Sequence, residues 1–237
     1  MLSKVIDVIE ETPDTRTIRF EVDNSFTFKP GQFVMINADV LINGEKKFVK
    51  RAYSISSSPL QKGYIDLTVK TFEIGLVSKR LYFMKKDEQM EITGPYGHFV
   101  FDENLHKHIA LIGAGSGITP FTCMMRYIQD KNLDNIEVDI LYSSKTPEDI
   151  IFREEFLKNK KRNIRVHLTI TRPEGNNWDR LTGRINEEMI KRCIKDINLP
   201  YFYVAGPTPM VEDTYELLKE MGIKEDKIKL ERFGANA

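Results

Sequence analysis

The sequence predicts two domains: a small antiparallel β-barrel followed by a doubly wound parallel five-stranded sheet. The 237 residues leave room for two modest domains. The first hundred residues form short β-rich segments separated by proline and glycine turns. From His106 onward, apolar strands alternate with amphipathic helices, which is typical of a parallel sheet covered on both faces. We expect the boundary near Phe101 to Leu105, giving domains of residues 1–102 and 103–237.

In the first domain, several strands at this spacing predict a barrel, because closure removes the exposed edges of an open sheet. The expected strands are Val5–Ile9, Thr15–Glu21, Gln32–Asn37, Arg51–Ser56, Tyr64–Thr71 and Gln89–Thr93. One helix, Val77–Tyr82, interrupts them.

In the second domain, five strands and four helices alternate. The expected strands are His108–Ile112, Glu137–Tyr142, Arg165–Ile170, Tyr201–Val204 and Lys227–Leu230. The expected helices lie near Pro120–Asp130, Glu148–Asn159, Asn186–Ile194 and Pro209–Met221.

Charge and cysteine content exclude several classes of function. The chain has 35 Lys plus Arg and 35 Asp plus Glu, so its net charge gives no reason to expect a nucleic-acid partner. Cys123 and Cys193 are too few for a four-thiolate zinc or iron–sulfur site. The acidic N-terminal segment lacks a signal-peptide core, and the uncharged run 109–125 is broken by glycines and a proline. We therefore expect a cytoplasmic protein without a membrane span, and any redox chemistry would come from a cofactor.

A glycine-rich turn, LIGAGSGITPF at residues 111–121, follows an apolar strand and opens a helix. Its glycines allow close approach of the backbone to a ligand: Gly113, Gly115 and Gly117. Thr119 is expected to cap the helix, with Pro120 at its first position. Because a helix start attracts anions, this turn predicts a seat for a pyrophosphate. The alternative is a tight connection between strand and helix, without a ligand.

The residues around this turn bear on the choice of dinucleotide. Ile118 stands where the dinucleotide fingerprint has a third glycine, and no acidic residue ends the next strand, where Lys145 follows two serines. A lysine in place of the ribose-binding carboxylate suits a 2′-phosphate and favours NADPH over NADH. Arg172, after the third strand, is a second candidate contact. An ordinary solvated lysine and a loop arginine are the alternatives.

The first domain carries three further motifs. Arg51 and Tyr53 lie on one face of a predicted strand and Ser54 on the other. Gly75 precedes a short helix with Ser78 in its first turn, a second place for a phosphate. A glycine- and proline-containing turn with two aromatic residues follows at 94–99. Each motif has a structural alternative, and their shared order along one chain is the informative observation.

This order of motifs resembles the ferredoxin-NADP reductase superfamily, whose members carry an FAD-binding barrel followed by a nicotinamide-binding domain. The motifs run from Arg51 to Phe233 and cover nearly the whole chain. The resemblance implies FAD and NADP as cofactors, with NAD as the alternative. It also implies that Arg51 holds the FAD pyrophosphate, that Tyr53 packs against the flavin and that Ser54 hydrogen-bonds near flavin N5. The second pyrophosphate clamp would be Gly75, Leu76, Val77 and Ser78.

In the second domain, the resemblance makes GAGSGITP the NAD(P) pyrophosphate loop, with Thr119 close to the nicotinamide. The segment YVAGPTPM at 203–210 is similar to the one that closes over the nicotinamide end, where Gly206 gives the close approach. Family members often end in a glutamate, any residue and an aromatic, matched here by Glu231 and Phe233. Both are catalytic candidates with Ser54. Phe233 would stack on the flavin ring where the nicotinamide must land, or else be a terminal aromatic of the core.

The sequence also departs from the family. Many members have a cysteine directly before the glycine that Gly206 matches. This chain has Ala205 there, so a thiol is not available to assist hydride transfer.

The implied activity is an FAD-dependent NAD(P)H oxidoreductase that exchanges single electrons with a separate carrier: a ferredoxin, a flavodoxin or an oxygenase component. Basic residues of the first domain would attract an acidic carrier, or else form a solvated face: Lys46, Lys47, Lys50, Lys79, Arg80, Lys85 and Lys86. Three other functions stay open: a free-flavin reductase, an electron-transfer subunit of a larger complex, and a nucleotide-binding module without redox activity.

Overall fold

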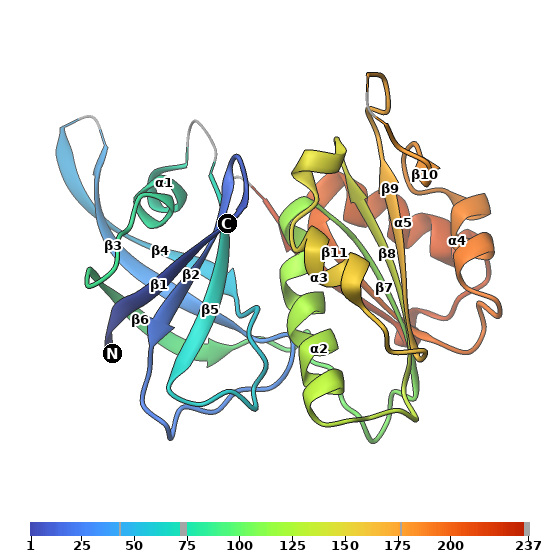
Figure 1. Cartoon of the computed structure of the whole chain (residues 1–237), viewed down its shortest axis with the longest axis horizontal. Helices are drawn as coiled ribbons and strands as arrows, with labels where there is room; N and C mark the ends of the chain where they lie inside the picture. The colour runs from blue at the N-terminus through green and yellow to red at the C-terminus, as the bar shows by residue number, and fades with distance from the viewer. Residues whose placement is uncertain (43, 72–74, 176, 235–237) are drawn as a thin grey trace. The chain divides into compact units, whose positions relative to one another are not determined.

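The computed structural model describes residues 1–42, 44–71, 75–175 and 177–234 and divides into two compact units. Unit 1 holds Met1–Val100 together with Thr119–Asp130, and unit 2 holds Phe101–Ile118 and Lys131–Gly234. Figure 1 shows an antiparallel sheet in the first and a helix-covered sheet in the second. The expected boundary at 102/103 stays a prediction.

Unit 1 contains a six-stranded antiparallel sheet in the order β4-β3-β6-β1-β2-β5. Its strands are β1 (Leu2–Thr12), β2 (Thr15–Glu21), β3 (Phe33–Ile42), β4 (Glu45–Ser54), β5 (Tyr64–Lys70) and β6 (Gln89–Tyr96). An antiparallel bridge from Ile55, directly after β4, to Leu67 of β5 joins the two edge strands. This bridge closes the sheet, and the predicted antiparallel barrel is confirmed.

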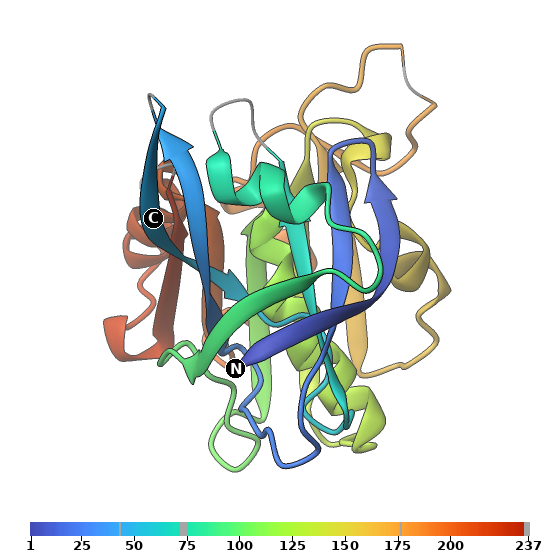
Figure 2. The ribbon, with the colours of Figure 1, turned by 90° about the vertical axis from the view of Figure 1, so that its left-hand side faces the viewer.

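Alternating apolar side chains fill the barrel. Ile18 and Phe20 of β2 and Ile65 and Leu67 of β5 are fully buried. Helix α1 (Leu76–Tyr82) buries Leu81 in the same core, as its predicted range implied. Figures 1 and 2 both show α1 near the end of the sheet where the β1–β2 and β3–β4 hairpins turn. The helix therefore covers one end of the barrel.

The β3–β4 hairpin is longer than the sequence predicted. The ladder continues from the pair Asn37 and Lys50 to the pair Ile42 and Glu45. Expected strand ends at Asn37 and Arg51 were therefore wrong, and Ser56 lies beyond β4. The outer half of β4 is exposed and charged, so it lacks the apolar alternation on which the prediction relied.

Unit 2 contains a six-stranded parallel sheet in the order β10-β9-β8-β7-β11-β12. Its strands are β7 (His108–Ala114), β8 (Glu137–Ser144), β9 (Ile164–Ile170), β10 (Leu181–Thr182), β11 (Tyr201–Pro207) and β12 (Ile228–Phe233). The five predicted strands are present, and β10 adds a sixth of two residues. Strand β7 lies in the middle of the sheet. The chain adds β8, β9 and β10 on one side of it and then β11 and β12 on the other. Ligands bind at the carboxyl ends of the strands flanking such a switch point, here β7 and β11.

Helices cover both faces of this sheet. They are α3 (Arg153–Lys158), α4 (Glu187–Cys193) and α5 (Thr208–Glu220), with 3₁₀ turns η1 (Gly115–Gly117), η2 (Pro147–Asp149) and η3 (Glu225–Lys227). Helix α2 (Ile118–Asp130) follows η1 and belongs to unit 1 from Thr119 onward. On β8, Leu141 packs in the core that α4 and α5 share, whereas the next residue, Tyr142, meets Phe156 of α3. Successive strand residues face opposite sides, so the predicted doubly wound arrangement is confirmed.

Two helix predictions were wrong in detail. Thr119 does not cap α2, because the 3₁₀ turn η1 begins at Gly115 and Thr119 is the second residue of α2. The expected helix Glu148–Asn159 is broken at Phe152, whose left-handed backbone (φ 57°) separates η2 from α3. By contrast, Asn186 caps α4 as its predicted start implied, accepting a hydrogen bond from the Met189 amide.

Candidate active site

The glycine-rich turn and the end of β11 meet backbone to backbone in unit 2. A Cβ atom on Gly117 would lie 2.1 Å from the carbonyl oxygen of Ala205, and one on Gly206 would lie 2.9 Å from the carbonyl oxygen of Ala114. No side chain fits at either position. These glycines therefore let the turn after β7 and the end of β11 pack directly against each other.

The turn itself suits an anion. Gly115 adopts a left-handed backbone (φ 56°), and a Cβ there would meet no atom within 4 Å. The Tyr142 hydroxyl of β8 donates to the Gly115 carbonyl over 3.0 Å and anchors the turn to β8. The first turns of η1 and α2 contain no acidic residue. The helix start therefore offers N–H groups without competing carboxylates. Gly113 is buried within β7, just before the turn.

Lys145 and Arg172, the predicted 2′-phosphate contacts, are neighbours in the backbone. The Arg172 amide donates to the Lys145 carbonyl over 2.8 Å, and both residues are exposed. Sequence reasoning missed Ser144, which precedes Lys145 in β8. Its hydroxyl is buried and has no hydrogen-bond partner among the described residues. An unsatisfied buried hydroxyl is costly unless a ligand completes it, so the end of β8 has the character of a binding surface.

Glu231 and Phe233 lie at the carboxyl end of β12, next to β11. Glu231 pairs with Ala205 and Phe233 with Pro207, which directly follows Gly206. Burial raises the pKa of the Glu231 carboxyl, and nearby Arg232 opposes this shift. The structure therefore brings both C-terminal candidates to the strand end that carries Gly206, and it makes Glu231 easier to protonate than an exposed glutamate.

In unit 1, the predicted flavin-contacting residues follow one another at the end of β4. Tyr53 packs against the barrel core, and burial raises the pKa of its hydroxyl. Arg51 extends from the same strand and donates to the Lys50 carbonyl over 2.9 Å. Ser54, half-buried, pairs with Phe33 of β3. The end of β4 thus presents a cation, a partly covered aromatic ring and a hydroxyl.

The second predicted phosphate clamp forms the start of α1. Gly75 is the N-cap, and the Ser78 hydroxyl donates to its carbonyl over 3.3 Å. Leu76 is exposed and Val77 is buried. The first turn of α1 contains no acidic residue. Its amide groups are therefore available to an anion.

These features fit two nucleotide cofactors. Arg51 and the acid-free first turn of α1 suit the phosphates of FAD, and Tyr53 offers a flat face to its ring. The open glycine-rich turn at Gly115 and the unsatisfied Ser144 hydroxyl suit NAD(P).

The described residues offer neither a metal centre nor a thiol nucleophile. No group of three His, Cys, Asp or Glu residues gathers in the described part of the chain. Burial raises the pKa of Cys123 to about 12 and that of Cys193 to about 11, so both thiols stay protonated and unreactive. No helix in the described ranges is both long and apolar enough to cross a membrane.

Comparison with known proteins agrees with this geometry. Residues 3–101 match the oxidoreductase FAD-binding domain family and residues 111–216 the oxidoreductase NAD-binding domain family. The chain is 31% identical over 239 residues to the glycine betaine monooxygenase reductase subunit of Chromohalobacter salexigens, covering 98% of this chain and 64% of that protein. It is also 31% identical over 204 residues to NADH-cytochrome b5 reductase 1 of Aspergillus oryzae, covering 81% of this chain and 68% of that protein.

One solved structure is similar to this chain over nearly the full length of both chains. The cytochrome b5 reductase domain of Ulva prolifera nitrate reductase has a TM-score of 0.85 and 25% identity, covering 97% of this chain and 96% of that chain. The chain thus spans nearly all of that domain, but just under two thirds of the C. salexigens reductase subunit.

Proposed function

Because the chain belongs to the ferredoxin-NADP reductase superfamily, we propose that it is an FAD-dependent NAD(P)H oxidoreductase. It passes hydride between NAD(P)H and flavin N5, and single electrons to or from a separate carrier. The observation that carries this proposal is the glycine-rich turn after β7, where a Cβ on Gly115 would meet no atom within 4 Å and Gly117 packs on the Ala205 carbonyl at the end of β11. Such a turn at the switch point, combined with a barrel that ends β4 in Arg51, Tyr53 and Ser54, suits two nucleotides.

The chain's own residues bind and orient the cofactors. Arg51 and the first turn of α1 hold the phosphates of FAD, and Tyr53 packs on its ring. The amides of Gly115 to Gly117 and the start of α2 hold the pyrophosphate of NAD(P)H. The flavin supplies the capacity to accept a hydride and to release electrons singly.

Three side chains are assigned to the reaction itself. Ser54 donates a hydrogen bond at flavin N5. Phe233 would shield the place where the nicotinamide must land, and Glu231 would exchange a proton near that position. The raised pKa of Glu231 suits this last assignment, because burial makes this carboxyl easier to protonate than an exposed glutamate.

NADPH is the preferred reductant in this proposal. Lys145 and Arg172 lie side by side at the ends of β8 and β9, and the Ser144 hydroxyl has no partner within the described chain. A 2′-phosphate would pair with both cations and accept from the hydroxyl, whereas the neutral ribose 2′-hydroxyl of NADH forms no ion pair with them.

The carrier is proposed to bind the basic face of unit 1. This face comprises seven exposed cationic residues: Lys46, Lys47, Lys50, Lys79, Arg80, Lys85 and Lys86. Three large exposed apolar side chains lie among them in the sequence: Phe48, Leu76 and Phe83. Arg80 links α1 to β3, because its guanidinium donates a hydrogen bond to the Asp39 carbonyl. Apolar anchors within a basic surface suit an acidic protein such as a ferredoxin or flavodoxin.

The named relatives support this division of labour. One is the reductase subunit of a monooxygenase and another reduces cytochrome b5, so both names describe electron delivery to a separate protein. An oxygenase component is therefore the third candidate partner.

Retention of flavin tests this function against its alternatives. The protein is purified, loaded with FAD and passed through a desalting column, and flavin per chain is measured. One FAD per chain, together with NADPH-dependent reduction of ferricyanide and of an acidic ferredoxin, is expected. Flavin lost on the column would indicate a free-flavin reductase. Bound flavin that no pyridine nucleotide reduces would overturn the proposal.

A further inference from the structure

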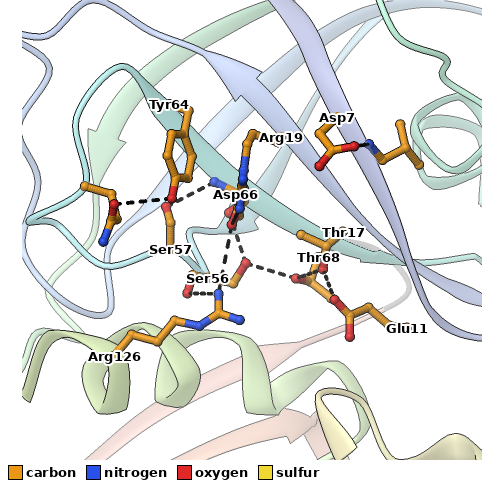
Figure 3. Close-up of polar contacts among 12 residues, drawn as sticks. Asp7, Glu11, Thr17, Arg19, Ser56, Ser57, Tyr64, Asp66, Thr68 and Arg126 are labelled. Atoms are coloured by element: carbon orange, nitrogen blue, oxygen red, sulfur yellow. Dashed lines mark hydrogen bonds and ion pairs between the residues drawn. The ribbon is translucent and has the colours of Figure 1, made fainter. Parts of the chain in front are cut away.

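A buried polar cluster attaches helix α2 to the barrel inside unit 1 (Figure 3). Arg126 of α2 donates from Nη1 to the Ser56 carbonyl over 3.0 Å and lies 4.0 Å from the Asp66 carboxylate. Asp66 of β5 is 3% exposed and is already held by Arg19 of β2 through two hydrogen bonds, of 2.8 and 3.0 Å. Arg19 alone thus supplies Asp66 with a complete partner.

The backbone of Asp66 holds the segment that follows β4. The Ser56 amide and hydroxyl both donate to the Asp66 carbonyl, over 2.9 and 3.1 Å. The Asp66 amide donates to the Ser57 hydroxyl over 3.0 Å. This segment begins two residues after Ser54. Ser54, which pairs with Phe33 of β3, is therefore followed closely by a segment that β5 holds through Asp66 and that Arg126 contacts at the Ser56 carbonyl.

Apolar contacts already keep α2 on the barrel. The rings of Phe121 and Phe99 lie 6.2 Å apart, and Gly31 leaves space that the Met124 side chain occupies, because a Cβ there would lie 2.7 Å from Met124 Cε. Such contacts are not directional and tolerate a small rotation or slide of the helix. The hydrogen bond from Arg126 is directional and fixes the register.

Arg126 and Thr119 lie on the same side of α2. Seven residues separate them, which is about two helical turns, roughly 10 Å along the axis. Thr119 is 2% exposed and follows directly on the glycine-rich turn. A change in how α2 is seated at Arg126 is therefore transmitted to Thr119 through a rigid helix.

We propose that Arg126 is a positioning residue, which fixes α2, and with it Thr119, against the segment that begins two residues after Ser54. The inference rests on the proposed function, because Thr119 and Ser54 are the residues assigned to the nicotinamide and to flavin N5. Arg126 is assigned to neither group itself. Its effect is on the alignment of the two, which governs the rate of hydride transfer more than the affinity for either nucleotide.

The test compares Arg126→Ala with Arg126→Lys and with a matched control on the same helix. Asp130 accepts a hydrogen bond from Gln61 over 3.3 Å, so Asp130→Asn weakens another polar contact of α2 inside unit 1, one that does not involve Ser56 or Asp66. For each protein, FAD per chain, the Kd for NADP⁺ and the rate constant of flavin reduction at saturating NADPH are measured, with thermal unfolding as a check on folding.

Arg126→Ala is expected to lower the reduction rate constant roughly tenfold to a hundredfold, the range that a misplacement of about 1 Å produces. FAD content and the Kd for NADP⁺ are expected to change by less than about twofold, because no residue assigned to the FAD site or to the NADP⁺ site is altered. Arg126→Lys should recover part of the rate, since an ammonium still donates to the Ser56 carbonyl. Amide hydrogen exchange in the segment 54–58 should be faster in Arg126→Ala and unchanged in Asp130→Asn.

A reduction rate in Arg126→Ala equal to that of the parent protein would overturn the inference and leave the proposed function intact. So would an equal loss in Asp130→Asn, which would indicate a general loosening of α2. If Arg126→Ala does not fold, Arg126→Lys and Asp66→Asn carry the same comparison. If neither NADPH nor NADH reduces the flavin bound to the parent protein, the proposed function is overturned, and the inference with it.

Discussion

The Arg172 amide donates to the Lys145 carbonyl over 2.8 Å, so two cationic residues end adjacent strands of the parallel sheet side by side. Thr171 strengthens this junction, because its amide donates to the Ser144 carbonyl over 3.0 Å. The strand ends are thereby held at a fixed spacing. Adjacent cations at that edge of a dinucleotide-binding sheet match a phosphate on the ribose.

Replacing both cations should abolish a preference for NADPH. In Lys145→Ala/Arg172→Ala, kcat/KM for NADPH is expected to fall by about a hundredfold, because each charge-assisted contact contributes about 1.5–3 kcal/mol. The value for NADH should stay within about threefold of the parent, since no other contact is removed. Initial rates with both nucleotides check this. An unchanged ratio of NADPH to NADH efficiency would remove the two residues from the account.

Ser54→Ala should slow flavin reduction without releasing FAD. Loss of one hydrogen bond at N5 is expected to reduce the rate constant by about tenfold to a hundredfold, corresponding to about 1–3 kcal/mol. Stopped-flow absorbance under anaerobic conditions measures the rate. Ser54→Thr keeps the hydroxyl and serves as the control, so it should retain most of the parent rate. Equal rates in the alanine variant and the parent would refute the role of the hydroxyl.

Gly117→Ala should weaken nucleotide binding because the added methyl group collides with the backbone of β11. Its Cβ would lie 2.1 Å from the Ala205 carbonyl oxygen, so the turn or the end of β11 must move. The Kd for NADP⁺ is expected to rise at least about tenfold, which is about 1.4 kcal/mol, while FAD content stays constant. Gly222→Ala is the control: its φ is 85° and a Cβ there meets nothing within 4 Å. Titration calorimetry that finds parent affinity in Gly117→Ala would contradict the close packing.

His106 should make stability fall in mild acid. Its ring lies 4.2 Å from that of Tyr201, and the Tyr203 hydroxyl hydrogen-bonds to its Nδ1 over 2.8 Å. Burial, assisted by Lys229, lowers the pKa of His106 from 6.5 to about 4. Between these values the unfolded chain binds the proton and the folded chain does not, so the free energy of unfolding decreases as pH falls from 6.5 toward 4.

The contribution of this histidine between pH 7 and pH 5 is roughly 2 kcal/mol, at 1.36 kcal/mol for each unit of pKa difference. Urea unfolding at both pH values measures it. His106→Asn keeps an acceptor for Tyr203 and cannot titrate, so its stability should depend less on pH by this amount. The same pH dependence in both proteins would show that His106 is not held neutral.

The elements that follow apolar periodicity could be predicted from the sequence. Strand β2 was placed at its observed bounds, Thr15–Glu21, because Ile18 and Phe20 alternate with polar residues. The glycine turn, Lys145 and Arg172 could also be predicted, since strand ends in a parallel sheet meet at one edge. The outer half of the β3–β4 hairpin could not, because its charged residues are held by backbone pairing rather than by burial.

The contact of Arg126 with Ser56 and Asp66 lay beyond sequence reasoning for a different reason. Its partners are separated from it by 70 and 60 positions in the chain, and each alone is an ordinary polar residue. Only the folded arrangement of α2 on the barrel brings them together. The buried Ser144 hydroxyl is similar, because its lack of a partner is a property of the packed strand end.

The most direct test of the account is an anaerobic single-turnover experiment with FAD-loaded protein and NADPH deuterated at the transferred C4 position. If the chain passes hydride from the nicotinamide to flavin N5, the flavin absorbance should bleach with one NADPH consumed per FAD, and bleaching should be slower with the deuterated nucleotide. A flavin that keeps its oxidised spectrum with excess NADPH and with excess NADH would contradict the account.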